Sequence, residues 1–139
     1  LGDVYKRQVM DRANDKGIIR TLLGRKCRFE LWEPSSFGVH KPLPLNQAQT
    51  EYGMAIKRAF TYKALNRLIQ GSAADQTKKA MVEVYEQLGV IPLIQVHDEL
   101  DCSVKNEKEG NQIKEIMETC VELKVPSKVD INISESWGG

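Results

Sequence analysis

The chain has 139 residues, of which 41% are hydrophobic and 28% are charged, and this composition argues against disorder, collagen-like repeats and coiled coils. No run approaches the roughly 20 apolar residues of a membrane helix, and the first residues lack the apolar core of a signal peptide, so we expect neither a membrane-spanning nor a secreted protein. The formal net charge of +1 divides unevenly, because residues 1–70 hold 13 Lys and Arg against 6 Asp and Glu, whereas residues 71–139 hold 7 against 13.

The first residues form a segment of their own. Residues 1–8 follow no clear amphipathic period, so we treat them as either native sequence or a non-native scar and leave them out of the fold argument. Residues 12–16 are polar and predict the end of a helix, with Gly17 as its stop signal. We therefore divide the chain into residues 1–16 and a main portion, residues 17–139.

The next part predicts a small hairpin followed by a loop. Residues 18–23 predict a strand that ends at Gly24, and the basic residues 25–28 follow it. Residues 29–32 predict a short return strand. Residues 33–46 contain three prolines, each of which disfavours helix in the residue before it, and therefore predict a loop.

A long helical pattern fills the middle of the chain. Apolar residues recur at steps of three and four from Asn46 to Ile69 and predict a helix. Gly71 and Ser72 interrupt this pattern and permit a bend. Residues 73–88 then predict a second helical stretch, which ends at the glycine that follows.

The last part predicts a second hairpin, a helix and a strand. Residues 90–96 and 100–104 predict antiparallel strands, which places residues 97–99 at the tip between them. Residues 107–123 predict an amphipathic helix, and alternation over residues 129–133 predicts a final strand. The order of elements predicts an α+β fold in which helices pack on an antiparallel sheet.

The strongest chemical signal lies in residues 95–100, which read Q-V-H-D-E-L. Asp98 and Glu99 are adjacent carboxylates at the expected hairpin tip, where their charges repel each other. Mg²⁺ would remove this repulsion, because carboxylate oxygens are ligands that it takes together with water and phosphate oxygens. A polar tip in which Asp98 and Glu99 serve only as turn formers is the structural alternative.

A second set of polar residues lies on the long helix. Asn66 and Gln70 are four residues apart and therefore share one helix face. Their amide groups both donate and accept hydrogen bonds, which suits the acceptors of the DNA minor groove, and Lys63 and Arg67 are near enough to meet phosphates. A solvated polar face explains the same pattern without DNA.

The turn in residues 21–26 is a third, weaker signal. A strand end, a glycine and the cation Arg25 would allow close approach to a nucleic acid backbone. An ordinary basic surface turn is the alternative. The uneven charge of the two halves is likewise compatible with a polyanion surface beside a cation pocket, or with uneven surface charge alone.

Segments of the chain together resemble the C-terminal palm of DNA polymerase family A, the group of bacterial DNA polymerase I and the phage replicases. Residues 95–100 resemble the motif on the palm hairpin, and residues 65–75 resemble the family's helix segment N-x-x-x-Q-G-T-A-A-D. Residues 17–28 are similar to the segment after the fingers, and residues 125–137 resemble the terminal strand and closing Glu-x-Trp. The resemblance covers residues 17–137 in the family's order, and the proline-rich loop is least alike.

The resemblance implies nucleotidyl transfer in DNA replication or repair, in which a primer 3′-hydroxyl attacks the α-phosphate of a dNTP and pyrophosphate leaves. It implies two Mg²⁺ ions in the complete enzyme, with Asp98 holding metal, Glu99 in a supporting catalytic role and His97 facing the primer terminus. It also implies that Asn66 and Gln70 touch the minor groove of the primer–template. Arg67, Lys63 and Arg25 are the further DNA-binding residues that the helix and the basic turn suggest.

The chain also departs from the family pattern. No segment resembles the D-Y-S-Q-I-E-like strand that carries the first metal-binding aspartate, and none resembles the fingers helix that holds the incoming triphosphate. Tyr62 stands where bacterial members carry an arginine that helps to grip the primer. We therefore expect an incomplete palm with half of a metal site and residues 1–16 as the end of a fingers helix. Its partners would be primer–template DNA, dNTP and the missing N-terminal part of the same polymerase, without which the chain would not polymerise.

Two other functions remain open at this point. A non-enzymatic DNA-binding module would use the basic half and the Asn66/Gln70 face without needing Asp98. A metal-dependent nuclease would gather Asp98, Glu99 and Asp101 around one ion, although adjacent strand residues point to opposite faces.

The number and spacing of the cysteines indicate the cellular compartment. Cys27, Cys102 and Cys120 form no C-x-x-C pair, which indicates neither a zinc site nor a disulfide framework. We expect the reducing cytoplasm of a bacterium or of a phage host.

Overall fold

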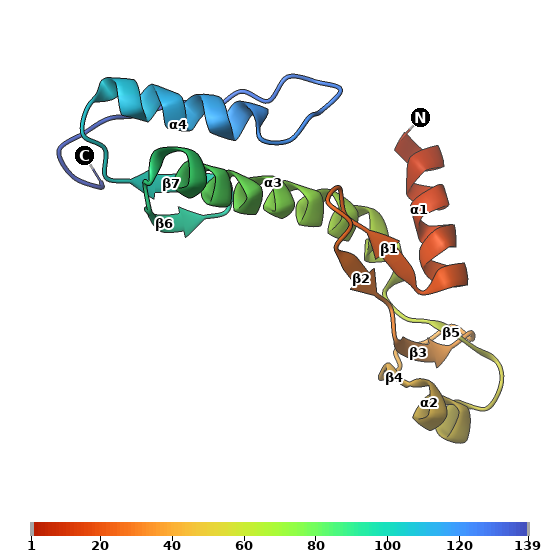
Figure 1. Ribbon diagram of the computed structural model, residues 1–139. Coiled ribbons are helices and arrows are strands. Elements are labelled where there is room, and N and C mark those ends of the chain that lie inside the picture. The colour runs from red at the N-terminus through yellow and green to blue at the C-terminus, as the bar shows by residue number, and fades with distance from the viewer. Residues whose placement is uncertain (1, 139) are drawn as a thin grey trace. The chain divides into compact units, whose positions relative to one another are not determined.

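The computed structural model describes residues 2–138, and the chain divides into two compact units, Leu1–Ser72 and Ala73–Gly139. The order of elements along the described residues is given in Figure 1. Among them, no helix is both long enough and apolar enough to cross a membrane.

The first unit begins with helix α1 (Gly2–Lys16), so the helix takes in the residues that we left out of the fold argument. It stops as predicted at Gly17, which has a φ of 66° and whose N–H donates to the Ala13 carbonyl at 2.9 Å. A left-handed residue at this position favours glycine. The predicted end of the helix is thus confirmed.

Strands β1 (Ile18–Arg20) and β2 (Lys26–Arg28) form an antiparallel hairpin. The strand that returns along β1 is thus residues 26–28 and not the predicted residues 29–32, of which 31 and 32 belong to the next strand of the chain. The Thr21 carbonyl accepts from Gly24 N–H at 2.9 Å, and the Thr21 hydroxyl accepts from Arg25 N–H at 3.1 Å. These bonds close the turn tightly enough for pairing to resume at Lys26.

A second sheet places β3 (Leu31–Pro34) between β4 (Leu43–Pro44) and β5 (Ile56–Arg58), with α2 (Leu45–Tyr52) following β4. The loop predicted over residues 33–46 is therefore correct only for its middle part.

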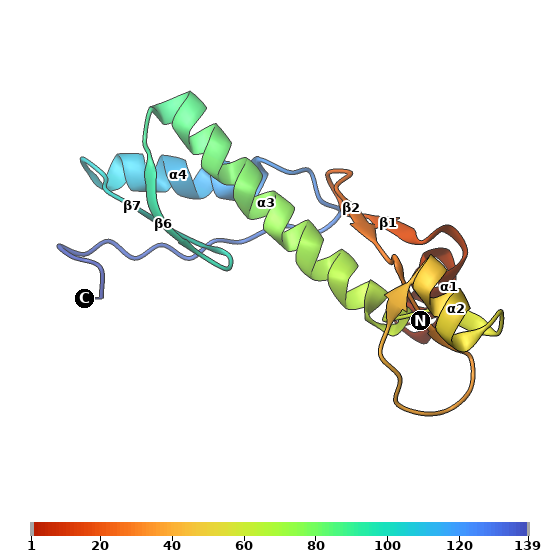
Figure 2. The ribbon, with the colours of Figure 1, turned by 90° about the horizontal axis from the view of Figure 1, so that it is seen from below.

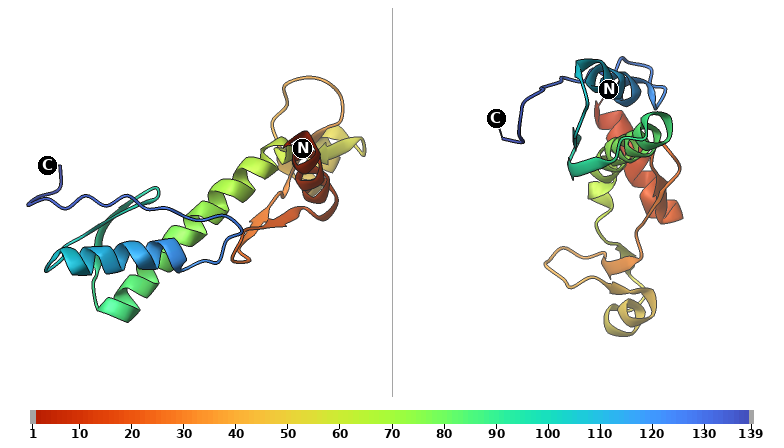
Figure 3. Two further views of the ribbon diagram at one scale, coloured as in Figure 1. Left: turned by 90° about the horizontal axis from the view of Figure 1, so that it is seen from above. Right: turned by 60° about the vertical axis from the view of Figure 1, so that its left-hand side comes forward.

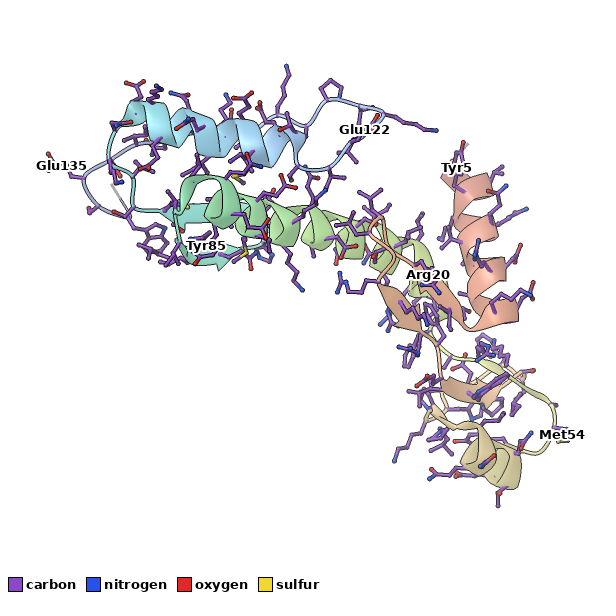
Figure 4. The ribbon with its side chains drawn as sticks, in the orientation of Figure 1. Tyr5, Arg20, Met54, Tyr85, Glu122 and Glu135 are labelled. Atoms are coloured by element: carbon purple, nitrogen blue, oxygen red, sulfur yellow. The ribbon has the colours of Figure 1, made fainter. Side chains whose placement is uncertain are left out.

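The predicted helix over residues 46–69 is wrong in its centre. Gly53 ends α2 with a φ of 75°, and Met54 follows on an outward loop with 81% of its surface exposed (Figure 4). Residues 56–58 then pair with β3, and a short 3-10 helix, η1 (Thr61–Lys63), precedes the next helix. Pairing with a distant strand overrides the local helical period here.

Helix α3 (Ala64–Leu88) contributes its first nine residues to the first unit and the rest to the second. It runs unbroken through Gly71 and Ser72, so the predicted interruption is wrong. The Ser72 hydroxyl donates to the Leu68 carbonyl at 2.7 Å, so its side chain bonds back to its own helix. Gly71 instead makes room, because an added Cβ would lie 2.8 Å from Cγ2 of Thr21. The absence of a side chain at Gly71 thus allows Thr21 to pack against the helix.

The second unit continues with β6 (Pro92–Val96) and β7 (Glu99–Cys102), which form the predicted hairpin, and with α4 (Glu107–Thr119). Gly89 ends α3 with a φ of 67°, as predicted. Helix α4 lies beside the C-terminal part of α3 (Figures 1 and 2). The buried core of this unit draws on both helices and on the residues that follow each of them, and consists of Ala80, Val84, Val90, Ile113, Ile116, Cys120 and Val121.

The predicted final strand over residues 129–133 is wrong. Figure 3 shows the segment after α4 as an extended trace, and no strand follows β7 in the described residues. Val129 N–H donates to a carboxylate oxygen of Glu118 at 2.8 Å instead of to a neighbouring strand. The α+β class is confirmed, with three small antiparallel sheets in residues 2–138 in place of one.

Candidate functional site

The β6–β7 turn carries the residues of the predicted metal site. His97 has a φ of 53°, a left-handed conformation that is strained for a residue with a side chain. The Gln95 amide donates to the His97 carbonyl at 2.6 Å and holds the turn closed. Asp98 and Glu99 are exposed at this tip, as predicted, and their carboxylates make no hydrogen bond or ion pair with another described residue.

Asp98 lies on the wall of a cavity of about 200 Å³ within the second unit. Gln76 of α3 and the extended segment Ser127 to Val129 line the same cavity, whereas Glu99 is not among its lining residues. The two adjacent carboxylates therefore have different surroundings. This agrees with the alternation of side chains along a hairpin.

Asp101 has a different environment on β7. Its Oδ2 atom is buried and has no hydrogen-bond partner. Across residues 2–138, no group of three or more His, Cys, Asp or Glu side chains is arranged to hold a metal ion. Asp98, Glu99 and Asp101 thus do not form the shared site that the nuclease alternative requires.

The predicted DNA-binding residues of the first unit lie around the start of α3. Asn66 and Gln70 are exposed there, one helical turn apart. Lys63 lies just before them, with its ammonium 5.2 Å from the Phe60 ring centre. The Arg67 guanidinium lies 5.0 Å from the ring centre of Phe29, so part of this cation is committed to packing.

The structure also brings Arg25 to this helix. Its guanidinium donates to the Gly71 carbonyl at 2.9 Å, and Leu22 N–H donates to the Ser72 hydroxyl at 3.0 Å. These contacts bind the basic turn to α3, so Arg25 lies in the same unit as Asn66 and Gln70 and contacts the helix that carries them. The sequence placed these residues in separate motifs.

The cysteines occupy packing positions. Burial, with the Asp101 charge as a second cause, raises the pKa of the Cys102 thiol above its usual range. Burial and then the Glu83 carboxylate raise the pKa of the Cys120 thiol. Both thiols stay protonated at neutral pH, which is typical of cysteines that pack and do not react.

The structure contains one contact near Asp98 that the sequence did not predict. The Gln76 amide donates to the Ser127 hydroxyl at 2.9 Å across the cavity wall. The two residues are 51 positions apart, so no motif or period links them.

Comparisons with known proteins agree with the family resemblance seen in the sequence. The sequence model of DNA polymerase family A matches residues 3–139. A protein named DNA-directed DNA polymerase from Pseudomonas phage M6 is 43% identical over 127 residues, which cover 91% of this chain and 16% of the phage protein. DNA polymerase I of Bacillus caldotenax is 32% identical in an alignment 142 positions long, gaps included, which covers 96% of this chain and 14% of that protein.

A solved polymerase structure also matches the fold of this chain. The POL domain of Pol1 from M. smegmatis, in complex with DNA primer-template and dNTP, matches with a TM-score of 0.62 and 32% identity, over 89% of this chain and 20% of that one. The chain therefore spans less than a fifth of the length of the curated relatives named above. Because the family model covers nearly all of its residues, the chain belongs to DNA polymerase family A.

Proposed function

We propose that this chain is the part of a DNA-directed DNA polymerase that supplies one metal-binding aspartate and a primer–template contact surface. The observation that carries the proposal is the exposed Asp98 carboxylate, which has no partner among the described residues and lines a cavity at the tip of a strained turn. The family membership supports nucleotidyl transfer in replication or repair as the reaction.

The donor chemistry fits a hard divalent cation. Asp98 offers carboxylate oxygens without competing hydrogen bonds, and Mg²⁺ takes one or two such carboxylates together with water and substrate phosphates. Glu99 would assist beside it. Two bound Mg²⁺ ions would supply activation of the primer 3′-hydroxyl and neutralisation of charge on the leaving pyrophosphate. The chain itself contributes the β6–β7 hairpin whose turn carries Asp98.

The first unit would bind the DNA. Asn66 and Gln70 would meet minor-groove acceptors, whose near-degenerate pattern allows base-pair geometry to be checked without reading sequence. Lys63, Arg67 and Arg25 would face phosphates, which position the duplex. His97 would face the primer terminus.

Primer extension tests the proposal. The chain alone would be compared with a chimera in which it replaces the matching 127 residues of the Pseudomonas phage M6 polymerase. Each protein would also carry Asp98→Asn, with Asp130→Asn as a control at an exposed aspartate that does not line the cavity. We expect extension only by the chimera, lost on Asp98→Asn and kept on Asp130→Asn.

Two results would contradict the proposal. One is a folded chimera that does not extend the primer, and the other is extension that is indifferent to Asp98→Asn. The DNA-binding module would remain if primer–template affinity, measured by fluorescence anisotropy, still fell on Asn66→Ala with Gln70→Ala.

A further inference from the structure

The extended segment after α4 contacts both helices of the second unit close to Asp98. Ser127 accepts a hydrogen bond from the Gln76 amide of α3 at 2.9 Å. Two residues later, Val129 N–H donates to the Glu118 carboxylate of α4 at 2.8 Å. The segment of residues 126–129, which we name the strap, is therefore held at two points by side chains of different helices.

The strap and Asp98 line the same cavity. Its wall includes Gln76, Ser127, Lys128 and Val129 together with Asp98. No ion pair joins Lys128 to Asp98 in the described residues, so the strap meets the aspartate across the cavity and not by direct charge contact. A displaced strap would change the volume and charge of this cavity.

Asp98 depends on such a wall because little else restrains it. A side-chain hydrogen bond from Gln95 to the His97 carbonyl closes its turn, and within residues 2–138 the carboxylate has no hydrogen-bond or ion-pair partner. The preceding His97 is in a left-handed conformation, which persists only when the surroundings enforce it. A carboxylate that binds metal must keep its position, and supporting residues that do not touch the metal commonly fix it.

We propose that Gln76 and Ser127 are positioning residues for Asp98, and that their hydrogen bond holds the strap as the wall that sets the aspartate's place. This inference rests on the proposed function, because it assigns to Asp98 the role of metal ligand. It predicts that the hydroxyl of Ser127 controls metal affinity although it binds no metal.

An isosteric pair of variants tests the hydroxyl. In the phage chimera, Ser127→Thr keeps the hydroxyl, whereas Ser127→Val replaces it by a methyl group of the same shape. Gln76→Leu removes the donor, and Gln87→Leu is the matched control, because Gln87 lies on the same helix and donates to Glu83 at 3.2 Å, and it does not line the cavity.

The measurements are Mn²⁺ binding by electron paramagnetic resonance, the Mg²⁺ concentration for half-maximal extension, and the urea midpoint. We expect Ser127→Val and Gln76→Leu to weaken Mn²⁺ binding and raise the Mg²⁺ requirement, by about tenfold. Ser127→Thr and Gln87→Leu should leave both unchanged.

The proposal is overturned if the Thr and Val variants bind Mn²⁺ equally, or if Gln76→Leu lowers only the urea midpoint. Failure of the proposed function looks different, because extension would then survive Asp98→Asn. If Asp98→Asn abolishes extension and Ser127→Val leaves metal binding unchanged, only the positioning role is wrong.

Discussion

Replacing Gly71 by alanine has two effects of opposite sign on the free energy of unfolding. Alanine is better than glycine in a helix interior by about 1 kcal/mol. The new Cβ, however, would lie 2.8 Å from Cγ2 of Thr21, which is closer than real Cβ contacts allow. Thr21 is 7% exposed and closes the β1–β2 turn through its bonds with Arg25, so it cannot move freely. Overpacking of this kind costs about 1–3 kcal/mol. We expect Gly71→Ala to lower the free energy of unfolding by about 1 kcal/mol, the difference between the two effects.

A double-mutant cycle isolates the clash. Thr21→Ser removes Cγ2 and keeps the hydroxyl, so in that background Gly71→Ala should be neutral or stabilising by up to about 1 kcal/mol. Urea denaturation followed by circular dichroism gives the four free energies. The reasoning is refuted if Gly71→Ala has the same effect with and without the methyl group of Thr21.

Other variants test single contacts. Arg58→Lys keeps the charge but loses the planar fork that donates to two backbone carbonyls and lies 4.5 Å from the Trp32 ring, so the free energy of unfolding should fall by about 2 kcal/mol; unchanged urea denaturation would contradict this. Asp101→Val removes a buried oxygen without a partner and should raise the urea midpoint more than Asp101→Asn, which keeps a polar atom there; a lower midpoint for the valine variant would show that the carboxylate stabilises the fold. Burial raises the pKa of the Cys102 and Cys120 thiols, so the folded state holds these protons more tightly than the unfolded state. The resulting stability is present below the ordinary thiol pKa and is lost as pH rises above it. Cys102→Ala with Cys120→Ala should flatten that decline, and an equal slope of stability against pH would exclude the thiols as its cause.

Local signals predicted the elements whose ends depend on one residue's conformation. Gly17 and Gly89 stop their helices with positive φ angles, as their sequence context indicates. The hairpin tip predicted over residues 97–99 lies at residues 97–98, and the helix that begins at Glu107 starts where the apolar period places it. Each of these features depends on neighbours within a few positions, which a sequence pattern contains.

Periodicity failed where a distant partner decided the outcome. Ala55 and Ala59 fit a helical spacing, yet the strand between them pairs with residues 32–34. Alternation over residues 129–133 predicts a strand, but Val129 bonds to a side chain of α4. A hydrophobic period is compatible with more than one partner, and only the folded backbone selects among them.

The candidate site likewise has features that the sequence predicts and features that only the fold creates. By itself, the sequence determined the chemistry: the adjacent carboxylates at a hairpin tip, the Asn66/Gln70 helix face and the order of motifs that indicates the polymerase family. Only the tertiary structure decided that Arg25 bonds to Gly71, 46 positions away, and that a hydrogen bond spanning 51 positions closes the wall beside Asp98. The physical reason is range, because side-chain type and spacing act over a few residues, whereas these hydrogen bonds exist only once the backbone has brought remote segments within 3 Å.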